Sequence, residues 1–209
     1  MIPRPRVIER IDETFRVHSV AALLGPRQCG KTTIARMIAQ QRPSVYFDLE
    51  NPIDARRLET PMRTLEKLKN LVIIDEVQRK PELFELLRVL VDRPDNPARF
   101  LLLGSASPYL VKGVSESLAG RIGFTDLSGF DLTEIGTGQH ECLWLRGGFP
   151  RAYLADDDPA SMLWRDDFIR TFLERDIPQL GITIPAETLR RFWTMIARRR
   201  FFAQAIHAG

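Results

Sequence analysis

Residues 25–33, Gly-Pro-Arg-Gln-Cys-Gly-Lys-Thr-Thr, have the composition and spacing of a phosphate-binding loop. They follow the apolar run 20–24 and fit the pattern G-x-x-x-x-G-K-[ST]. Glycine backbones let successive N–H groups converge on phosphate oxygens, and a helix beginning at Lys31 would add its free N–H groups and positive dipole end. Lys31 would bridge the β- and γ-phosphates. The predicted nucleotide-binding residues are Gly25, Pro26, Arg27, Gln28, Cys29, Gly30, Lys31, Thr32 and Thr33.

A second chemical feature is the pair Asp75-Glu76, which follows the apolar run 71–74. The carboxyl ends of parallel strands line the ligand crevice of a sheet, so this pair should lie beside the glycine loop. There the Thr32 hydroxyl and the Asp75 carboxylate would hold Mg²⁺, and Glu76 would orient and deprotonate a water that attacks the γ-phosphoryl group. The glutamate favours hydrolysis, and the lack of an N-K-x-D stretch favours ATP over GTP.

Two further residues are candidates for the catalytic set. Ser105 follows the apolar run 99–104, and if that run pairs with the strand before the loop, Ser105 lies near the γ-phosphate. Arg121 is a candidate for an arginine that stabilises developing charge in its own chain or across a subunit contact. A serine-rich turn and a surface arginine are the ordinary alternatives. The predicted catalytic residues are Glu76, Lys31, Ser105 and Arg121, and the predicted metal ligands are Thr32 and Asp75.

The elements that must position these residues alternate along the chain, which predicts an α/β fold with a mainly parallel sheet. Apolar or alternating runs predict strands over 20–24, 44–49, 71–75, 99–104 and 122–128. Helical spacing predicts helices over 6–16, 31–41 and 81–92, one after an Asp158 cap, and one from about 185. A turn-rich texture then predicts a P-loop core over 1–135 and a helical segment over 136–209.

Composition limits the other possibilities. The chain has 209 residues and 44% hydrophobic side chains, enough for one well-packed domain and a small appendage. Its 30 basic and 27 acidic side chains nearly balance, so the basic run 198–200 is the main local support for a nucleic-acid partner. Cys29 and Cys142 form no C-x-x-C pair, which favours a reducing compartment. Without a secretory or membrane-spanning stretch, the sequence predicts a cytoplasmic protein.

The ordered motifs resemble a family of prokaryotic AAA-like P-loop ATPases, in which the AAA domain precedes a C-terminal domain of unknown function. The resemblance covers about residues 6–197 and includes VYFDLENP, LVIIDEVQRKPELFELLRVLVD, LLLGSAS, ESLAGRI and GGFPRAYL. It implies an additional-strand sheet of order near 5-1-4-3-2, with residues 25–33 as the Walker A loop and Asp75-Glu76 as the Walker B pair. Ser105 takes the place of the sensor-1 residue, and Arg121 matches an arginine of the family's GRI motif.

The chain departs from the family pattern after residues 190–197, Arg-Arg-Phe-Trp-Thr-Met-Ile-Ala. We therefore expect a C-terminally truncated or divergent family member. The leading interpretation is an ATP-binding protein whose Mg²⁺-dependent hydrolysis drives a conformational change, acting with a protein partner or as a homo-oligomer. Two alternatives stay open: an ATP-dependent switch that does not hydrolyse, and a nucleic-acid-dependent ATPase.

Overall fold

The computed structural model describes residues 2–94, 98–105, 113–114, 116–179 and 181–206. The chain forms two compact units, residues 1–154 and 155–209, and each is described by itself. Across the described ranges, no helix has both the length and the apolar character needed to cross a membrane.

The first unit is built on a five-stranded parallel sheet of order β2-β3-β4-β1-β5. Read from the other edge this is 5-1-4-3-2, so the predicted fold class and strand order are confirmed. Because all strands run the same way, the strands that end with Leu24, Asp75 and Gly104 bring these residues to the same edge of the sheet, the one formed by the carboxyl ends of the strands. The strands are β1 Val20–Leu24, β2 Ser44–Asp48, β3 Leu71–Asp75, β4 Arg99–Gly104 and β5 Ile122–Asp126.

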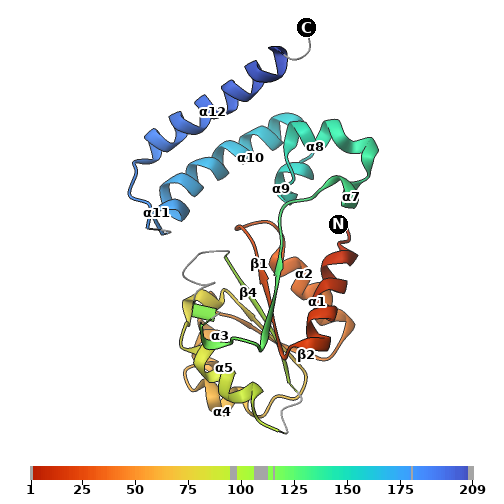
Figure 1. Ribbon diagram of the computed structural model, residues 1–209, viewed down its shortest axis with the longest axis vertical. Helices are drawn as coiled ribbons and strands as arrows, with labels where there is room; N and C mark the ends of the chain where they lie inside the picture. Colours follow the sequence, from red (N-terminus) through yellow and green to blue (C-terminus); the bar gives the residue numbers. More distant parts are fainter. Residues whose placement is uncertain (1, 95–97, 106–112, 115, 180, 207–209) are drawn as a thin grey trace. The chain divides into compact units, whose positions relative to one another are not determined.

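Helices cover both faces of this sheet (Figure 1). The alternate residues of β1 divide between two hydrophobic clusters, since successive side chains of a strand point to opposite faces. Ala21 and Leu23 pack with Ile11 and Ile34, whereas Ala22 packs in the cluster of the other face. One face carries α1 Pro5–Val17 and α2 Lys31–Gln41, and the other carries α3 Pro52–Arg57, α4 Pro61–Leu65 and α5 Leu83–Val91.

The predicted bounds of β1, β3, β4 and α2 match the structure, but the helix predicted from Pro81 begins later. Helix α5 starts at Leu83, and Pro81 lies in a turn closed by a 3.0 Å hydrogen bond from the Leu83 amide to the Lys80 carbonyl. The short 3-10 helix η1, Val77–Arg79, occupies the start of this connection. Helices α3 and α4 were not predicted because five or six residues are too few to display a helical period.

After β5 the chain forms three short helices that still belong to the first unit. They are α7 Leu132–Ile135, α8 His140–Arg146 and α9 Pro150–Tyr153, and the 3-10 turn η2 Thr137–Gln139 lies between α7 and α8. The first of these begins with a capping box, in which Asp131 accepts from the Thr133 and Glu134 amides and Glu134 accepts from the Asp131 amide. The Phe130 amide donates to the Gly148 carbonyl at 2.6 Å, which joins residues 147–150 to the end of the sheet.

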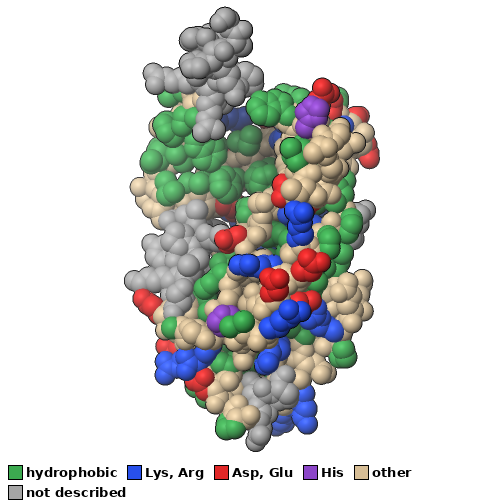
Figure 2. All heavy atoms as spheres, turned by 45° about the vertical axis from the view of Figure 1, so that its right-hand side comes forward, with side chains coloured by type: hydrophobic (Ala, Val, Ile, Leu, Met, Phe, Trp, Pro, Cys, Tyr) green, Lys and Arg blue, Asp and Glu red, His purple; other side chains and the backbone are tan. Residues whose placement is uncertain are grey.

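The second unit is helical, with α10 Asp158–Thr171, the π-helical turn η3 Phe172–Asp176, α11 Ile177–Gln179 and α12 Ala186–Ile206. The cap of α10 is Asp157, which accepts from the Ala160 amide, so the predicted cap at Asp158 is wrong by one residue. Stacked rings run from Trp164 through Phe168 and Phe172 to Trp193. Figure 2 shows hydrophobic side chains gathered on these helices, in the upper part of the view.

Candidate functional site

The glycine loop, residues 25–33, leaves β1 at the carboxyl edge of the sheet and enters α2 at Lys31. Gln28 and Gly30 have φ values of 64° and 104°, and such left-handed positions turn successive N–H groups toward one concave side. A Cβ atom on Gly25 would lie 2.1 Å from the Leu127 carbonyl oxygen, so this position requires glycine. The N-cap of α2 is Gly30, which has no side chain to cap the helix, and the first N–H groups stay available to an anion.

Lys31 is held inside the loop. Its side chain is buried, and Nζ donates to the carbonyl oxygens of Gly25 and Pro26, each at 2.8 Å. An ammonium group has three N–H bonds, and two of them are used by these loop carbonyls. The positive charge is therefore placed in the concave loop, next to the amino end of α2.

The Asp75 carboxylate connects the loop to β3 and β2. Its Oδ2 atom accepts hydrogen bonds from the Thr32 hydroxyl at 2.8 Å and from the Tyr46 hydroxyl at 2.6 Å. The Glu76 amide donates to the other oxygen, Oδ1, at 2.9 Å. Burial, with the hydrogen bond to Asp75, raises the pKa of Tyr46 far above its usual range, so its hydroxyl stays a donor. Asp75 is thus fixed in one orientation by three different segments.

The Thr32 hydroxyl and the Asp75 carboxylate have the chemistry that Mg²⁺ requires. This ion takes oxygen ligands, is often held by one or two protein groups, and draws its remaining ligands from phosphates and water. Among the described residues there is no group of three or more His, Cys, Asp and Glu side chains that could enclose a metal ion. The pair therefore fits a metal that is shared with a phosphate ligand.

Glu76 lies immediately beyond Asp75 in a left-handed conformation, with a φ of 55°. Its half-buried carboxylate accepts a short hydrogen bond from the Gln78 side-chain amide. Burial raises the pKa of Glu76, and the neighbouring charges of Asp75 and Glu50 raise it further. A raised pKa brings a carboxylate closer to the range in which it works as a general base. The Gln78 contact keeps this carboxylate turned toward η1.

Ser105 lies at the loop, as its strand position predicts. Strand β4 pairs with β1, and Leu24 lies opposite Gly104 in the register. The Gly25 amide donates to the Gly104 carbonyl at 3.4 Å, which places the half-buried Ser105 directly beyond the first residue of the loop. The neighbouring-strand condition on which the Ser105 prediction rested is therefore met.

Arg121 lies at the opposite edge of the sheet. Its carbonyl accepts from the amide of Val20, the first residue of β1, whereas the glycine loop follows the last residue of that strand. Four residue steps of a strand separate the two edges by about 13 Å. The guanidinium pairs with both oxygens of Asp92, at 2.6 and 2.8 Å. The structure thus does not bring Arg121 to the glycine loop of its own chain.

A pocket of about 260 Å³ lies beside the loop, where the N-terminal segment, α2 and the segment after β5 meet. Its lining is mainly apolar, which suits a flat organic group more than a phosphate. The lining residues are Ile2, Arg4, Cys29, Gly30, Thr33, Ile34, Met37, Phe130, Pro150 and Leu154. A nucleotide with its phosphates on the loop could therefore place its base here.

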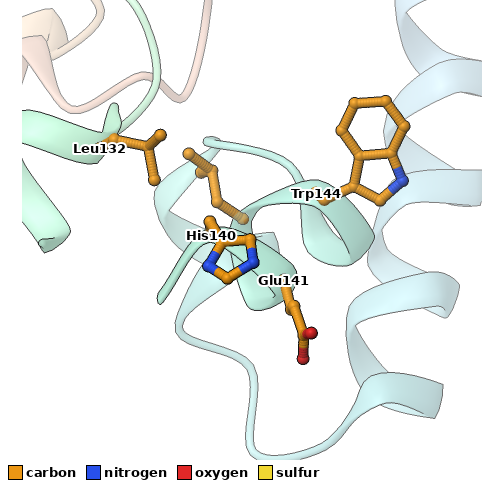
Figure 3. Close-up of a pocket in the computed structure, with 5 residues that line it drawn as sticks. Leu132, His140, Glu141 and Trp144 are labelled. Atoms are coloured by element: carbon orange, nitrogen blue, oxygen red, sulfur yellow. The ribbon is translucent and has the colours of Figure 1, made fainter. Parts of the chain in front are cut away.

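A second pocket, of about 560 Å³, lies on α7 and α8 and contains no loop residue. Figure 3 shows His140 and Glu141 projecting from the first turn of α8, with Trp144 one turn further and Leu132 on the other side. The Trp144 side chain is 77% exposed. The described residues of its lining include neither a lysine nor an arginine, so this pocket does not suit a phosphate group.

Sequence reasoning missed two residues of the site, Tyr46 and Arg4. Tyr46 lies two residues before the end of β2, next to β3 in the sheet, and this adjacency was the signal that could have found it. Arg4 precedes the first helix and contacts the loop through the fold, with the Cys29 carbonyl 3.4 Å from its Nη1 atom. No local pattern marks such a long-range contact.

Comparison with known proteins agrees with this geometry. Residues 138–201 match a domain of unknown function, DUF8612. Two uncharacterized proteins, from Mycobacterium bovis and Mycobacterium tuberculosis, are each 52% identical to the chain in an alignment of 197 residues, which covers 91% of this chain and 45% of each relative. The chain thus spans less than half the length of the curated relatives it matches.

Among solved structures, a Walker-type ATPase of Pyrococcus abyssi matches with a TM-score of 0.59 and 18% identity, over 91% of this chain and 76% of that one. Identity this low supports a common fold alone. The sequence match is more specific, because residues 17–136 correspond to the family described as an AAA domain and include the glycine loop, Asp75 and all five strands. With more than half of its length matched, the chain belongs to the AAA domain family of P-loop NTPases.

Proposed function

We propose that the chain binds ATP with Mg²⁺ and hydrolyses it. The observation that carries the proposal is the 2.8 Å hydrogen bond between the Thr32 hydroxyl and Asp75 Oδ2. It joins the helix that follows the glycine loop to the acidic end of β3, so both halves of an Mg²⁺–triphosphate site lie within reach of one another. Nucleotide binding follows from the AAA domain itself, while hydrolysis and metal dependence are what the experiments below test.

In this proposal the phosphates lie on the loop and the base enters the 260 Å³ pocket beside it. Gly30, Thr33 and Met37 line that pocket from the loop and the first turns of α2. A purine ring would therefore extend from the phosphate site without leaving the surface of the same helix. The apolar lining supplies stacking and packing surface for the ring.

The chain's own groups would divide the chemical work. Lys31 would exchange a loop carbonyl for a phosphate oxygen and stabilise negative charge on the γ-phosphoryl group. Glu76 would orient a water for in-line attack and accept its proton, and Ser105 would contact that water or the γ-phosphate. Thr32 and Asp75 would hold Mg²⁺, which would supply positive charge against the negative charge of the phosphates. Release of the phosphate contacts would then alter the conformation of the loop and its neighbours.

A second candidate function is an ATP-dependent switch with negligible turnover. Two observations favour it: the Gln78 amide binds the Glu76 carboxylate, and Arg121 lies at the far edge of the sheet. Gln78 occupies one oxygen of the Glu76 carboxylate, which leaves fewer acceptor sites to align a water, and Arg121 of the same chain does not reach a γ-phosphate on the loop. The basic run 198–200, which favoured nucleic acid, falls where side chains are not described.

One experiment separates these functions. ATP affinity and single-turnover hydrolysis are measured for the wild type, Lys31→Ala and Glu76→Gln, with and without Mg²⁺ and with DNA or RNA added. We expect Lys31→Ala to abolish binding, and Glu76→Gln to bind ATP without hydrolysing it. Equal ATP affinity for the wild type and Lys31→Ala contradicts nucleotide binding at the loop. Tight binding by the wild type without any hydrolysis would instead establish the switch.

A further inference from the structure

Arg4 is a buried arginine that joins the N-terminal segment to the glycine loop. Its side chain is 6% exposed, and its guanidinium group donates to the carbonyl oxygens of Cys29 at 3.4 Å, Ser128 at 2.9 Å and Gly129 at 3.2 Å. The Arg4 backbone carbonyl accepts from the amides of Val7 and Ile8 in the first turn of α1, so both the backbone and the side chain of Arg4 are held. Several buried partners fix an arginine far more firmly than one surface ion pair does.

The same guanidinium group pairs with Glu134, from Nε to Oε1 at 2.6 Å, where the glutamate side chain is 9% exposed. The other oxygen of Glu134 accepts from the Asp131 amide as part of the capping box of α7. The Arg4 charge also lies over the Phe130 ring, 5.4 Å from its centre. Figure 1 shows the N-terminal end of the chain next to α7. Arg4 therefore binds the glycine loop and the segment after β5 at the same time.

The contact with Cys29 has a consequence for the phosphate site. The Cys29 carbonyl and the Gly30 amide belong to one planar trans peptide unit, so they point in opposite directions. Because Arg4 binds this carbonyl, the Gly30 N–H points away from Arg4, to the other side of the peptide unit. Gly30 has a φ of 104° and no side chain to resist rotation of this peptide unit, so its orientation depends on such a partner.

We propose that Arg4 is a positioning residue of the phosphate site: by holding the Cys29 carbonyl it directs the Gly30 N–H at the phosphates, and Glu134 holds Arg4 in place. The inference rests on the proposed nucleotide binding at the loop. Arg4 need not touch the nucleotide, although it lines the pocket proposed for the base. Because Arg4 acts through the loop, its loss would weaken the binding of any polyphosphate, whether or not a base is attached.

The test compares ATP with inorganic tripolyphosphate, which lacks a base, as ligands of the wild type, Arg4→Met and Arg4→Lys. Each affinity is measured by displacement of a fluorescent ATP analogue in the presence of Mg²⁺. We expect Arg4→Met to weaken both ligands by about tenfold, the effect of one lost charge-assisted contact. Arg4→Lys should recover part of the loss, since an ammonium group can reach one or two of these oxygens but not all. The matched control is Arg170→Met, which removes an exposed ion pair with Glu174.

A folded Arg4→Met that binds both ligands as the wild type does would overturn the inference. A loss confined to ATP would also overturn it, because Arg4 would then act on the base and not through the loop. If Arg4→Met does not fold, Glu134→Gln decides: weaker tripolyphosphate binding supports the inference, and wild-type binding contradicts it. If ATP displaces no analogue from the wild type, the proposed nucleotide binding itself fails. The comparison of the wild type with Lys31→Ala detects that failure separately from any effect of Arg4.

Discussion

The Tyr46 hydroxyl donates a 2.6 Å hydrogen bond to the Asp75 oxygen that also accepts from Thr32. Tyr46 comes from β2, Asp75 from β3, and Thr32 from the helix after the glycine loop, so a single oxygen atom joins three segments. A metal ion at Asp75 would have to share this oxygen or use the other, to which the Glu76 amide donates. Tyr46 thus bears on how the proposed metal ligand is oriented, in the way that outer partners fix carboxylate ligands in known metal sites.

The first prediction is that Tyr46→Phe raises the Mg²⁺ concentration needed for half-maximal ATP binding by about tenfold. This is the lower end of the effect expected when a metal-binding carboxylate loses a hydrogen-bond partner. The phenyl ring keeps the packing of β2 and removes one hydrogen bond to Asp75. The measurement is a Mg²⁺ titration at fixed ATP concentration. Tyr153→Phe, at a tyrosine in α9, is the matched control. Equal Mg²⁺ midpoints for both variants and the wild type would show that Tyr46 is only a packing residue.

The second prediction concerns Glu76 and pH. Burial raises the pKa of Glu76 above the reference value of 4.5, and Asp75 and Glu50 raise it further. Because the folded state holds this proton more tightly, the contribution of Glu76 to stability is fully present below pH 4.5 and is lost as the pH rises through its folded pKa. Glu76→Gln should therefore melt at a higher temperature than the wild type at neutral pH.

The difference between these two melting curves should shrink as the pH falls toward 4.5. Glu82→Gln, which removes an exposed carboxylate on the same connection, is the control and should show no such trend. If the difference in melting temperature between the wild type and Glu76→Gln stays constant from neutral pH to pH 4.5, the folded state does not disfavour the charged form of Glu76.

The sequence predicted the centre of the fold better than its margins, for a physical reason. Strands β1 and β3 are buried on both faces, so every residue is apolar up to the edge where Asp75 ends β3, and their bounds can be read directly. Helix α5 begins two residues later than predicted, because Pro81 lies in a turn that the Leu83 amide closes on the Lys80 carbonyl, a contact that helical spacing does not reveal.

The candidate site likewise contains residues that local sequence predicts and residues that depend on contacts distant in the chain. The loop and the acidic pair were predicted from spacing, because local geometry fixes what those residues can do. Tyr46 and Arg4 were missed because their partners are 29 and 25 or more positions away in the chain. The position of Arg121 could have been inferred: it precedes a strand, and ligands of parallel sheets gather where strands end.

The third prediction is that Gly25→Ala displaces the glycine loop. The new Cβ atom would lie 2.1 Å from the Leu127 carbonyl oxygen and 3.0 Å from Cys29 Sγ, and the first of these contacts involves backbone that cannot rotate away. We expect a loss of about 1–3 kcal/mol in the free energy of unfolding, together with weaker ATP binding. Gly138→Ala has no atom within 4 Å of its added methyl group and serves as the control in urea denaturation and binding assays. Unchanged ATP affinity in Gly25→Ala would contradict the role of this loop.

The last prediction concerns Arg121, which pairs with Asp92 at the far edge of the sheet. Arg121→Ala should bind ATP with wild-type affinity, since the side chain does not reach the loop of its own chain. If a second subunit supplies this arginine, hydrolysis per molecule should rise with protein concentration in the wild type and stay low in Arg121→Ala. A mixture of Arg121→Ala, which keeps the ATP site, and Lys31→Ala, which keeps the arginine, should then recover turnover that neither variant has alone. Full activity of Arg121→Ala by itself, at every concentration, would exclude a catalytic arginine at this position in either arrangement.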